Sequence, residues 1–198
     1  GAIGLYGTGA DFGLDIADGA LDTDSGDITL EGTATAATAT AGVRVTGDGL
    51  VTNGGDITIT GTSAGGVGVQ LGDGSAFAIG SGGGSITIEG TGIDAGVLMQ
   101  GNQVTSGGGA VSITGTGATI GVSLEGSDID SAGGGIDIDG IASAAGGIGV
   151  SLYDAQLTGG AGDVIVRGTA AAGIGIQFGY GSAISTTTGA IGLYGTGA

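Results

Sequence analysis

The sequence is organised around a short strand pattern that recurs eight times in 198 residues. In one copy, Ile57 and Ile59 alternate with Thr58 and Thr60 before a turn predicted at Gly61, and this period of two is typical of a half-buried β-strand. The first apolar residues of the eight copies are Ile3, Ile28, Ile57, Ile86, Val111, Ile136, Val164 and Ile191. Successive copies lie 25, 29, 29, 25, 25, 28 and 27 residues apart. A unit of this length cannot bury its apolar side alone, so the repeat predicts coils that stack on a shared core.

Each repeat also contains a second strand and a shorter third one. Three alternating apolar residues of every second strand are expected to face the core: Phe12, Leu14, Ile16; Ala41, Val43, Val45; Val67, Val69, Leu71; Ala95, Val97, Met99; Ile120, Val122, Leu124; Ile148, Val150, Leu152; and Ile174, Ile176, Phe178. The third strand is predicted around one apolar anchor per repeat: Leu21, Leu50, Phe77, Val104, Ile129, Leu157 and Ile184. This anchor precedes the next first strand by seven residues in six repeats and by nine after Phe77. Insertions are expected at the edge between the first and second strands.

These patterns predict an all-β fold, a right-handed parallel β-helix (β-solenoid) with three strands per coil and seven coils of 25–29 residues. Each strand is expected to pair with its counterparts in the neighbouring coils, and parallel crossovers are overwhelmingly right-handed. Glycine, present 53 times, suits the corners, and the absence of proline suits a hydrogen-bonded ladder. At about 4.8 Å per coil, seven coils rise on the order of 34 Å.

The two ends of the sequence carry the same ten residues. Residues 1–10 and residues 189–198 both read GAIGLYGTGA, at an offset of 188 residues that equals the seven coil steps. We therefore expect residues 1–188 to be one full tandem repeat of a continuous β-solenoid, and residues 189–198 to start the next repeat. The expected partners are then copies of the same unit, end to end and side by side. An engineered duplication of the termini is the alternative.

The strand motifs GDITLEGT, GDITITGT and GSITIEGT, each followed by a second strand of the form G-[VI]-G-[VI]-x-[LF], resemble filamentous haemagglutinin-type repeats. Such repeats occur in large bacterial adhesins, many of which are exported by two-partner secretion. The resemblance extends over all seven coils. It implies a long extracellular or cell-surface filament with a structural or adhesive role, for which cell-surface glycans are a candidate partner.

Composition excludes several classes of function. Nineteen acidic residues stand against two arginines, with no lysine and no histidine, and the formal net charge is −17. Nucleic acid, itself a dense polyanion, is therefore excluded as a partner. The lack of cysteine and histidine excludes disulfides, thiolate or imidazole metal sites and catalytic triads. No apolar run approaches the roughly 20 residues of a membrane-spanning helix. We expect neither enzymatic activity nor a required cofactor.

Two groups of aspartates are candidate calcium ligands, because calcium prefers oxygen donors. The groups lie on either side of a third strand and the corner after it, where side chains of adjacent coils could converge. They comprise Asp22, Asp24 and Asp27, and Asp128, Asp130, Asp137 and Asp139. The alternative, which we favour, is a solvated acidic edge with diffuse counterions.

Two other functions remain open as alternatives. The first is a carbohydrate-binding or carbohydrate-degrading β-helix: carbohydrate-degrading enzymes share the right-handed β-helix, and Asp137 with Asp139 could act as a paired-carboxylate hydrolase. Against this, both residues are expected on one face of a simple repeated strand. Ice binding is the other alternative, because Thr58 and Thr60 form a Thr-x-Thr pair of the kind that some β-helical ice binders present. Charged residues interrupt the expected array.

Two further columns of the repeat are predicted to make specific contacts, one of glycines and one that contains charged residues. Every second strand has glycine between its first two core positions, at Gly13, Gly42, Gly68, Gly96, Gly121, Gly149 and Gly175. These glycines are expected to point outward and to form a smooth groove that serves as a lateral interface; the alternative is a backbone conformation that only glycine tolerates. In the first strands, Arg167 is expected to lie between Asp139 and Tyr194.

Overall fold

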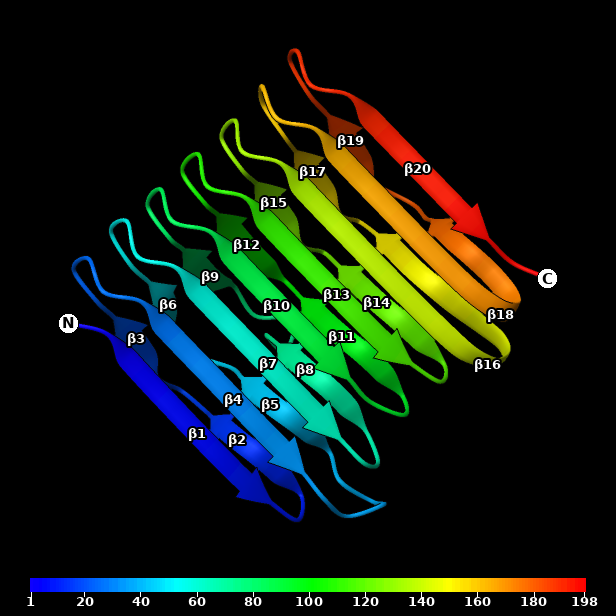
Figure 1. Ribbon diagram of the computed structural model, residues 1–198, viewed down its shortest axis with the longest axis horizontal. Helices are drawn as coiled ribbons and strands as arrows, with labels where there is room; N and C mark the ends of the chain where they lie inside the picture. The colour runs from blue at the N-terminus through cyan, green and yellow to red at the C-terminus, as the bar shows by residue number, and fades with distance from the viewer.

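The computed structural model describes all 198 residues, and it contains strands and turns but no helix. Its twenty strands wind into a parallel β-solenoid of seven coils that stack in sequence order from the N-terminus to the C-terminus (Figure 1). Every strand pairs in parallel with its counterpart in an adjacent coil. The predicted all-β solenoid with three strands per coil is therefore confirmed.

The strands fall into three stacks, which we call the first, second and third strands of each coil. The first strands are β1 (Ile3–Gly9), β4 (Ile28–Ala34), β7 (Ile57–Ser63), β10 (Ile86–Thr91), β13 (Val111–Gly117) and β20 (Ile191–Thr196). The second strands are β2 (Phe12–Ile16), β5 (Ala41–Val45), β8 (Val67–Leu71), β11 (Ala95–Gln100) and β14 (Ile120–Glu125). The third strands are β3 (Ala20–Asp22), β6 (Gly49–Val51), β9 (Phe77–Gly80), β12 (Asn102–Thr105), β15 (Asp128–Asp130), β17 (Gln156–Thr158) and β19 (Ala183–Ser185). In coils six and seven, the first and second strands run together as β16 (Ile136–Tyr153) and β18 (Val164–Phe178).

Stacking is in register, so one position of the repeat forms a column through the molecule. Ile28 pairs with Ile57, and Ile57 pairs with Ile86. Of the 135 backbone hydrogen bonds, 87 lie within the strand ladders, and side chains of one kind are placed directly above one another at about 4.8 Å. The sequence repeat is thereby converted into ladders of identical or similar residues.

The core is a set of aliphatic ladders enclosed by the three strand stacks. A cluster of 29 buried residues draws Ile57 and Ile59 from a first strand, Val69 and Leu71 from a second and Ile79 from a third, each 0% exposed. Complete burial of each such side chain stabilises the fold by about 1.5–3 kcal/mol. Because every coil repeats this arrangement, the stability of the stack comes from the contact between neighbouring coils.

The third strand of coil three differs from the prediction. The residue that pairs with Leu50 and Val104 is Ile79, while Phe77 pairs with Asn102. Seven residues therefore separate the core anchor from the next first strand in every coil, including this one. The additional residues of coil three form the corner between its second and third strands, so insertions occur at a second edge as well.

The first strands are also longer than predicted. The strand β7 continues past Gly61 to Ser63, with Gly61 and Ser63 buried and Thr62 exposed between them. Glycine at this position is a strand residue and does not begin a turn. Each first strand therefore places three residues on its outer face, one more than the sequence pattern indicated.

Candidate functional site

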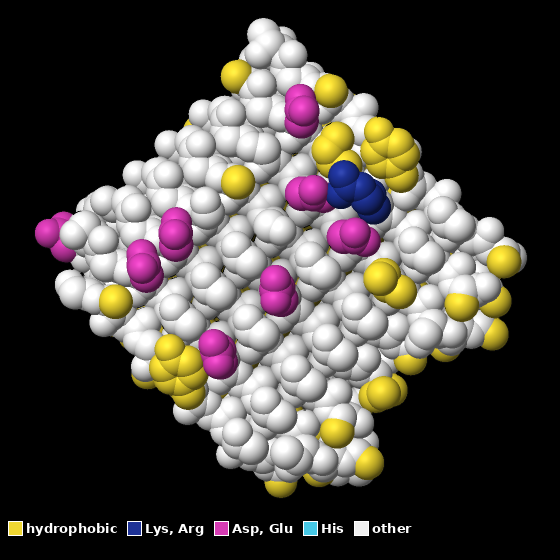
Figure 2. Space-filling view, viewed as in Figure 1, with side chains coloured by type: hydrophobic (Ala, Val, Ile, Leu, Met, Phe, Trp, Pro, Cys, Tyr) yellow, Lys and Arg dark blue, Asp and Glu magenta, His cyan; other side chains and the backbone are white.

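The outer face of the first strands is flat and rich in threonine over its central coils. On β4, β7, β10 and β13, the outward positions form three columns: Thr29, Thr58, Thr87 and Ser112; Glu31, Thr60, Glu89 and Thr114; and Thr33, Thr62, Thr91 and Thr116. Figure 2 shows this face as a regular surface with a few isolated carboxylates. The third column was not predicted, because the sequence pattern indicated a turn at this point. The spacing Thr-x-Thr-x-Thr in the sequence could have indicated that the strand continues.

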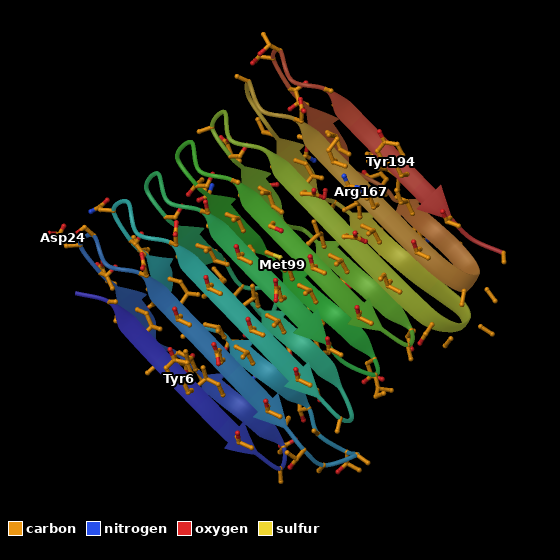
Figure 3. All side chains as sticks on the ribbon, in the orientation of Figure 1. Tyr6, Asp24, Met99, Arg167 and Tyr194 are labelled. Atoms are coloured by element: carbon orange, nitrogen blue, oxygen red, sulfur yellow. The ribbon has the colours of Figure 1, made fainter.

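A charged group lies on the same face near the C-terminal end. The Nη1 group of Arg167 on β18 donates a hydrogen bond to Oδ1 of Asp137 on β16, at 2.5 Å. The expected neighbours Asp139 and Tyr194 do pair with Arg167 in the strand register, and Figure 3 shows Arg167 beside Tyr194. The ion pair nevertheless goes to Asp137, because the long arginine side chain reaches across to the adjacent outward column. Both partners are about half exposed, so this pair contributes only about 0–1 kcal/mol.

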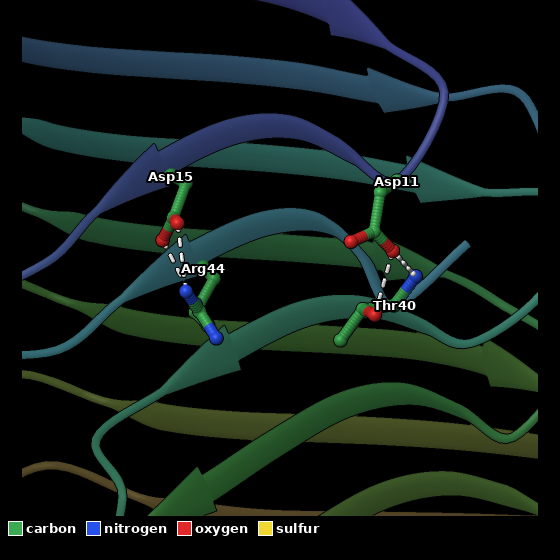
Figure 4. A network of polar contacts seen from close by, with 4 residues as sticks. All are labelled: Asp11, Asp15, Thr40 and Arg44. Carbon is green, nitrogen blue, oxygen red and sulfur yellow. Dashed lines mark hydrogen bonds and ion pairs between the residues drawn. The ribbon is translucent and has the colours of Figure 1, made fainter.

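The outer face of the second strands carries the other arginine. Arg44 donates from Nε and Nη2 to the two carboxylate oxygens of Asp15, at 2.8 Å and 2.7 Å (Figure 4). This hydrogen-bonded pair raises the pKa of Arg44 above its ordinary value. The guanidinium carbon of Arg44 also lies 4.2 Å from the centre of the Phe12 ring, as a cation–π contact. In the loop nearby, Asp11 accepts hydrogen bonds from the hydroxyl and the amide of Thr40 (Figure 4).

The predicted glycine groove is wrong, because the second-strand glycines face the interior. All of them except Gly13 in the first coil are buried. A Cβ atom on Gly68 would lie 2.7 Å from the carbonyl carbon of Gly90 and 2.6 Å from the oxygen of Gly96. A Cβ atom on Gly61 would in turn lie 2.8 Å from the carbonyl carbon of Gly68. The first strands thus present an opposing column: Gly7, Gly32, Gly61, Gly90, Gly115, Gly140, Gly168 and Gly195. Backbone packs on backbone here, and both columns are glycine because no side chain fits between them.

This inward turn of the glycines changes the direction of the residue before each of them. The pairing of the second strands passes from Ala41 and Val67 directly to Val43 and Val69 and omits the glycines between, as in a β-bulge that puts two successive residues on one side. Phe12, which was predicted for the core, lies on the outer side beneath Arg44. The first members of the predicted triplets divide into two groups. Ala41 and Ala95 are buried, at 0% and 5% exposure, as predicted. The others are half-buried or exposed: Phe12, Val67, Ile120, Ile148 and Ile174.

The candidate calcium ligands are not brought together. No group of three or more carboxylates has an arrangement that could hold a metal ion. Asp22, Asp128 and Asp130 project from third strands, Asp24 from a corner, and Asp137 and Asp139 from the outer face of β16. Residues of the same strand face point in parallel into solvent, so their oxygens do not converge. Asp137 is in addition engaged by Arg167.

Asp27 has a different task, which it shares with the same position of other coils. Its carboxylate accepts the backbone N–H of Asp56 at 2.9 Å, and Asp56 accepts the N–H of Ser85 at 2.7 Å. Asp163 does the same for Ala190 at 2.6 Å. These aspartates hold adjacent coils together just before the first strand, through charge-assisted hydrogen bonds to the backbone.

A buried ladder of hydroxyl groups lines the corner between the third and first strands. Ser81 donates to the carbonyl oxygen of Gly84 at 2.5 Å and lies 3.1 Å from the carbonyl oxygen of Ser106 in the next coil. The hydroxyl-bearing members of this column are Thr23, Thr52, Ser81, Ser106, Ser131 and Thr186. The spacing Ser/Thr-x-x-Gly marks this corner in the sequence and was not used in the prediction.

The arrangement therefore offers flat, periodic surfaces, and no group of three or more carboxylates is placed to hold a metal ion. The chain contains no helix long and apolar enough to cross a membrane. Comparison of the chain with models of protein families, with curated proteins and with solved structures gave no match.

Proposed function

We propose that this chain is a segment of an extracellular fibre, a tandem repeat of a long secreted β-solenoid with a structural and adhesive role. The residue pattern that resembles filamentous haemagglutinin-type repeats supports this, as does a fold built only of stacked coils. A formal charge of −17 keeps such filaments soluble by mutual repulsion. The repeated outer faces give an adhesive filament many equivalent surfaces, for which cell-surface glycans are the proposed partner.

The observation that carries the proposal is the equivalence of β1 and β20. The two strands have the same sequence, and β20 sits in register on β18 as a first strand, with Val164 opposite Ile191. The local arrangement is repeated as well, because the ring of Tyr6 covers Gly4 and the ring of Tyr194 covers Gly192. After seven coil steps, the eighth first strand therefore returns to the conformation of the first one, which is the condition for continuing the stack with a further repeat.

A tandem protein tests this proposal. Residues 1–188 are placed twice in succession and followed by residues 189–198, and the product is compared with the original chain by small-angle X-ray scattering. A continuous solenoid gives an unchanged cross-section and about twice the length, since each coil adds about 4.8 Å.

An out-of-phase tandem provides the control. Here the second copy is joined after residue 176, within β18, so that the third strand of coil seven is missing. We expect this protein to scatter as two rods with a flexible joint. If the in-phase tandem scatters in the same way, the repeat is not continuous and the proposed fibre fails.

Ice binding is a second candidate function, favoured by the third threonine column. Nine threonines and one serine fill ten of the twelve outward positions on four adjacent strands, interrupted by Glu31 and Glu89. Their hydroxyl and methyl groups repeat at about 4.8 Å across the strands and at about 6.6 Å along them. Threonine is stiff at χ1, so this lattice is preorganised for a periodic solid. The patch contains no aromatic ring on which a sugar could stack.

Thermal hysteresis measures this second function directly. Wild-type protein should slow ice growth, and Thr62→Lys in the middle of the lattice should abolish the effect. Thr105→Lys on a third strand serves as the matched control and should leave it unchanged. Absence of hysteresis in the wild-type protein removes ice binding as a function.

A further inference from the structure

The outer face of the second strands carries an apolar column that the sequence pattern had assigned to the core. Because the glycines turn inward, the residues before them lie outside the core cluster. Val67, Ile120 and Ile148 are half-buried, and Ile174 is 47% exposed. Beside this column, Leu98 projects from β11 between Gln70 and Ser123 of the neighbouring coils. Apolar side chains thus lie on this face in several coils, whereas Ala41 and Ala95, at the same position in coils two and four, are buried at 0% and 5% exposure.

The same face has the lowest charge on the molecule. Its strand residues include one internally compensated ion pair, Asp15 with Arg44, and one further carboxylate, Glu125, which accepts a hydrogen bond from Gln100 at 2.9 Å. The first-strand face, in contrast, exposes the unpaired carboxylates of Glu31 and Glu89 and carries the half-buried Asp139, in addition to the ion pair of Asp137 with Arg167. Two copies of a chain with charge −17 repel each other on every acidic surface. The second-strand face is the one on which a copy can approach without this repulsion.

We propose that the second-strand outer face is an interface between two copies of this chain, packed face to face and side by side. A surface that binds a copy of itself forms a two-fold symmetric contact. In such a contact, if one residue of the first copy contacts a second residue of the other, the reverse contact is also made. The contact therefore joins filaments in pairs and leaves the acidic first-strand faces of both copies exposed. This inference rests on the proposed function, because it describes how the filaments associate laterally.

The size of the face predicts how strong this contact is. Seven coils of five-residue strands cover about 34 Å by about 16 Å, or roughly 550 Å² on each copy. A stable interface of standard size buries about 800 Å² per partner. Two single chains should accordingly associate weakly, because the face is smaller than a stable interface of standard size. Tandem repeats multiply the contact, and the second and later repeats then bind at high effective concentration.

Sedimentation equilibrium of the 198-residue chain over a concentration series tests the proposal. Wild-type protein should show a monomer–dimer equilibrium that strengthens as salt is raised, because salt screens the repulsion between the copies. Leu98→Glu should weaken dimerisation by about tenfold or more, since it buries an uncompensated charge in the contact. Thr87→Glu places the same charge on the first-strand face of the same coil, and it should change the dissociation constant by less than about twofold.

A second pair of variants covers the case that Leu98→Glu impairs folding. Gln70→Glu is a nearly isosteric change on the second-strand face, and Thr60→Glu on the first-strand face is its control. A chain that stays monomeric at millimolar concentration and high salt overturns the interface. Equal weakening by the variants on the two faces overturns it as well, because the effect is then one of net charge. The scattering experiment on the tandem protein measures length, whereas sedimentation measures lateral association.

The two proposals can therefore fail separately. If the tandem is a continuous rod but Leu98→Glu does not weaken dimerisation, only the lateral contact is ruled out. If the tandem is hinged but Leu98→Glu weakens dimerisation selectively, only the continuous fibre is ruled out.

Discussion

Ile88 and Gly90 lie two residues apart on β10, and both face the interior of the same coil, yet they pack by opposite means. Around Ile88 the strand stacks stand far enough apart for aliphatic side chains to fill the space, and its exposed fraction is 0%. Around Gly90 the first and second strands approach until backbone meets backbone, and an added Cβ atom would lie 2.6 Å from the carbonyl carbon of Gly96. Met99 on β11 lies in the wide part of the interior and is 0% exposed (labelled in Figure 3).

This difference shows that a solenoid sets its cross-section residue by residue. In the wide part, side-chain volume determines the distance between strands, as in an ordinary close-packed core. At the glycine edge, the absence of side chains determines it. The coil therefore tapers towards the edge where the chain passes from first to second strand, and every coil must taper equally for the ladders to stay in register. Volume removed from one region and volume added to the other should both be destabilising.

The largest effect is expected for removal of volume from the wide part. Ile88→Ala should lower the free energy of unfolding by about 4 kcal/mol, since it deletes buried methyl groups and leaves a cavity between ladders. Urea denaturation followed by circular dichroism measures this loss. Thr87→Ala, on the outer face of the same strand, is the control and should change stability by less than about 0.5 kcal/mol. Similar values for the two variants would contradict the packed ladder.

The second largest effect is expected when one carbon atom is added at the glycine edge. Gly90→Ala should destabilise by about 3 kcal/mol, because the new methyl group meets the backbone of Gly96 and neither strand can move without losing register. Gly80→Ala is the matched control: its Cβ atom would have only the hydroxyl oxygen of Thr105 within reach, at 3.7 Å. This control should be neutral or slightly stabilising. If Gly90→Ala behaves like Gly80→Ala, the two edges of the coil do not differ as described.

The fold could be predicted from the sequence because its main signal is periodic. Ile28, Ile57 and Ile86 recur at the spacing of one coil, and their ladder is the one observed. The register of the third strand was harder to predict, because this strand is short and has few apolar residues that identify its core position. In coil three both Phe77 and Ile79 are apolar and buried, and only the pairing with Leu50 and Val104 selects Ile79.

The direction of the glycine column could not be read from alternation. Glycine has no side chain that reveals a face, and the bulge at Gly68 makes two successive residues point inward, which a strict period of two cannot represent. Whether the candidate calcium ligands converge could not be read from spacing either. Spacing in the sequence placed Asp137 and Asp139 near one another, but parallel positions on one strand face keep their carboxylates apart. The partner of Arg167 depended on side-chain reach, which register alone does not define.

A third region, the hydroxyl corner, sharpens the comparison because it is buried and polar. Ser81→Ala should destabilise by about 1–2 kcal/mol, since it leaves the carbonyl oxygen of Gly84 without the hydroxyl group that donates to it. Ser81→Thr keeps the hydroxyl group, as Thr52 does in the coil below, and should stay within about 0.5 kcal/mol of the wild type. Denaturation curves of the two variants measure the difference. Equal stability of both would mean that the hydroxyl ladder contributes nothing to the corner.

The smallest effect is expected at a corner position that holds alanine, where the two neighbouring coils have glycine and where glycine should be the more stabilising residue. Ala132 adopts φ of +51°, whereas the same corner position holds Gly107 in the coil below and Gly160 in the coil above, with φ of +67° and +59°. The left-handed conformation is unfavourable for alanine by roughly 1–2 kcal/mol, and glycine loses about 0.5–1 kcal/mol more chain entropy on folding. Ala132→Gly should therefore stabilise the protein by about 0.5 kcal/mol, which corresponds to a rise of about 1–2 °C in Tm. Ala161→Gly is the control, because Ala161 has no positive φ, and it should lower Tm by a similar amount. Calorimetry distinguishes the two, and a fall in Tm for Ala132→Gly would show that glycine is required in this chain only where backbones touch.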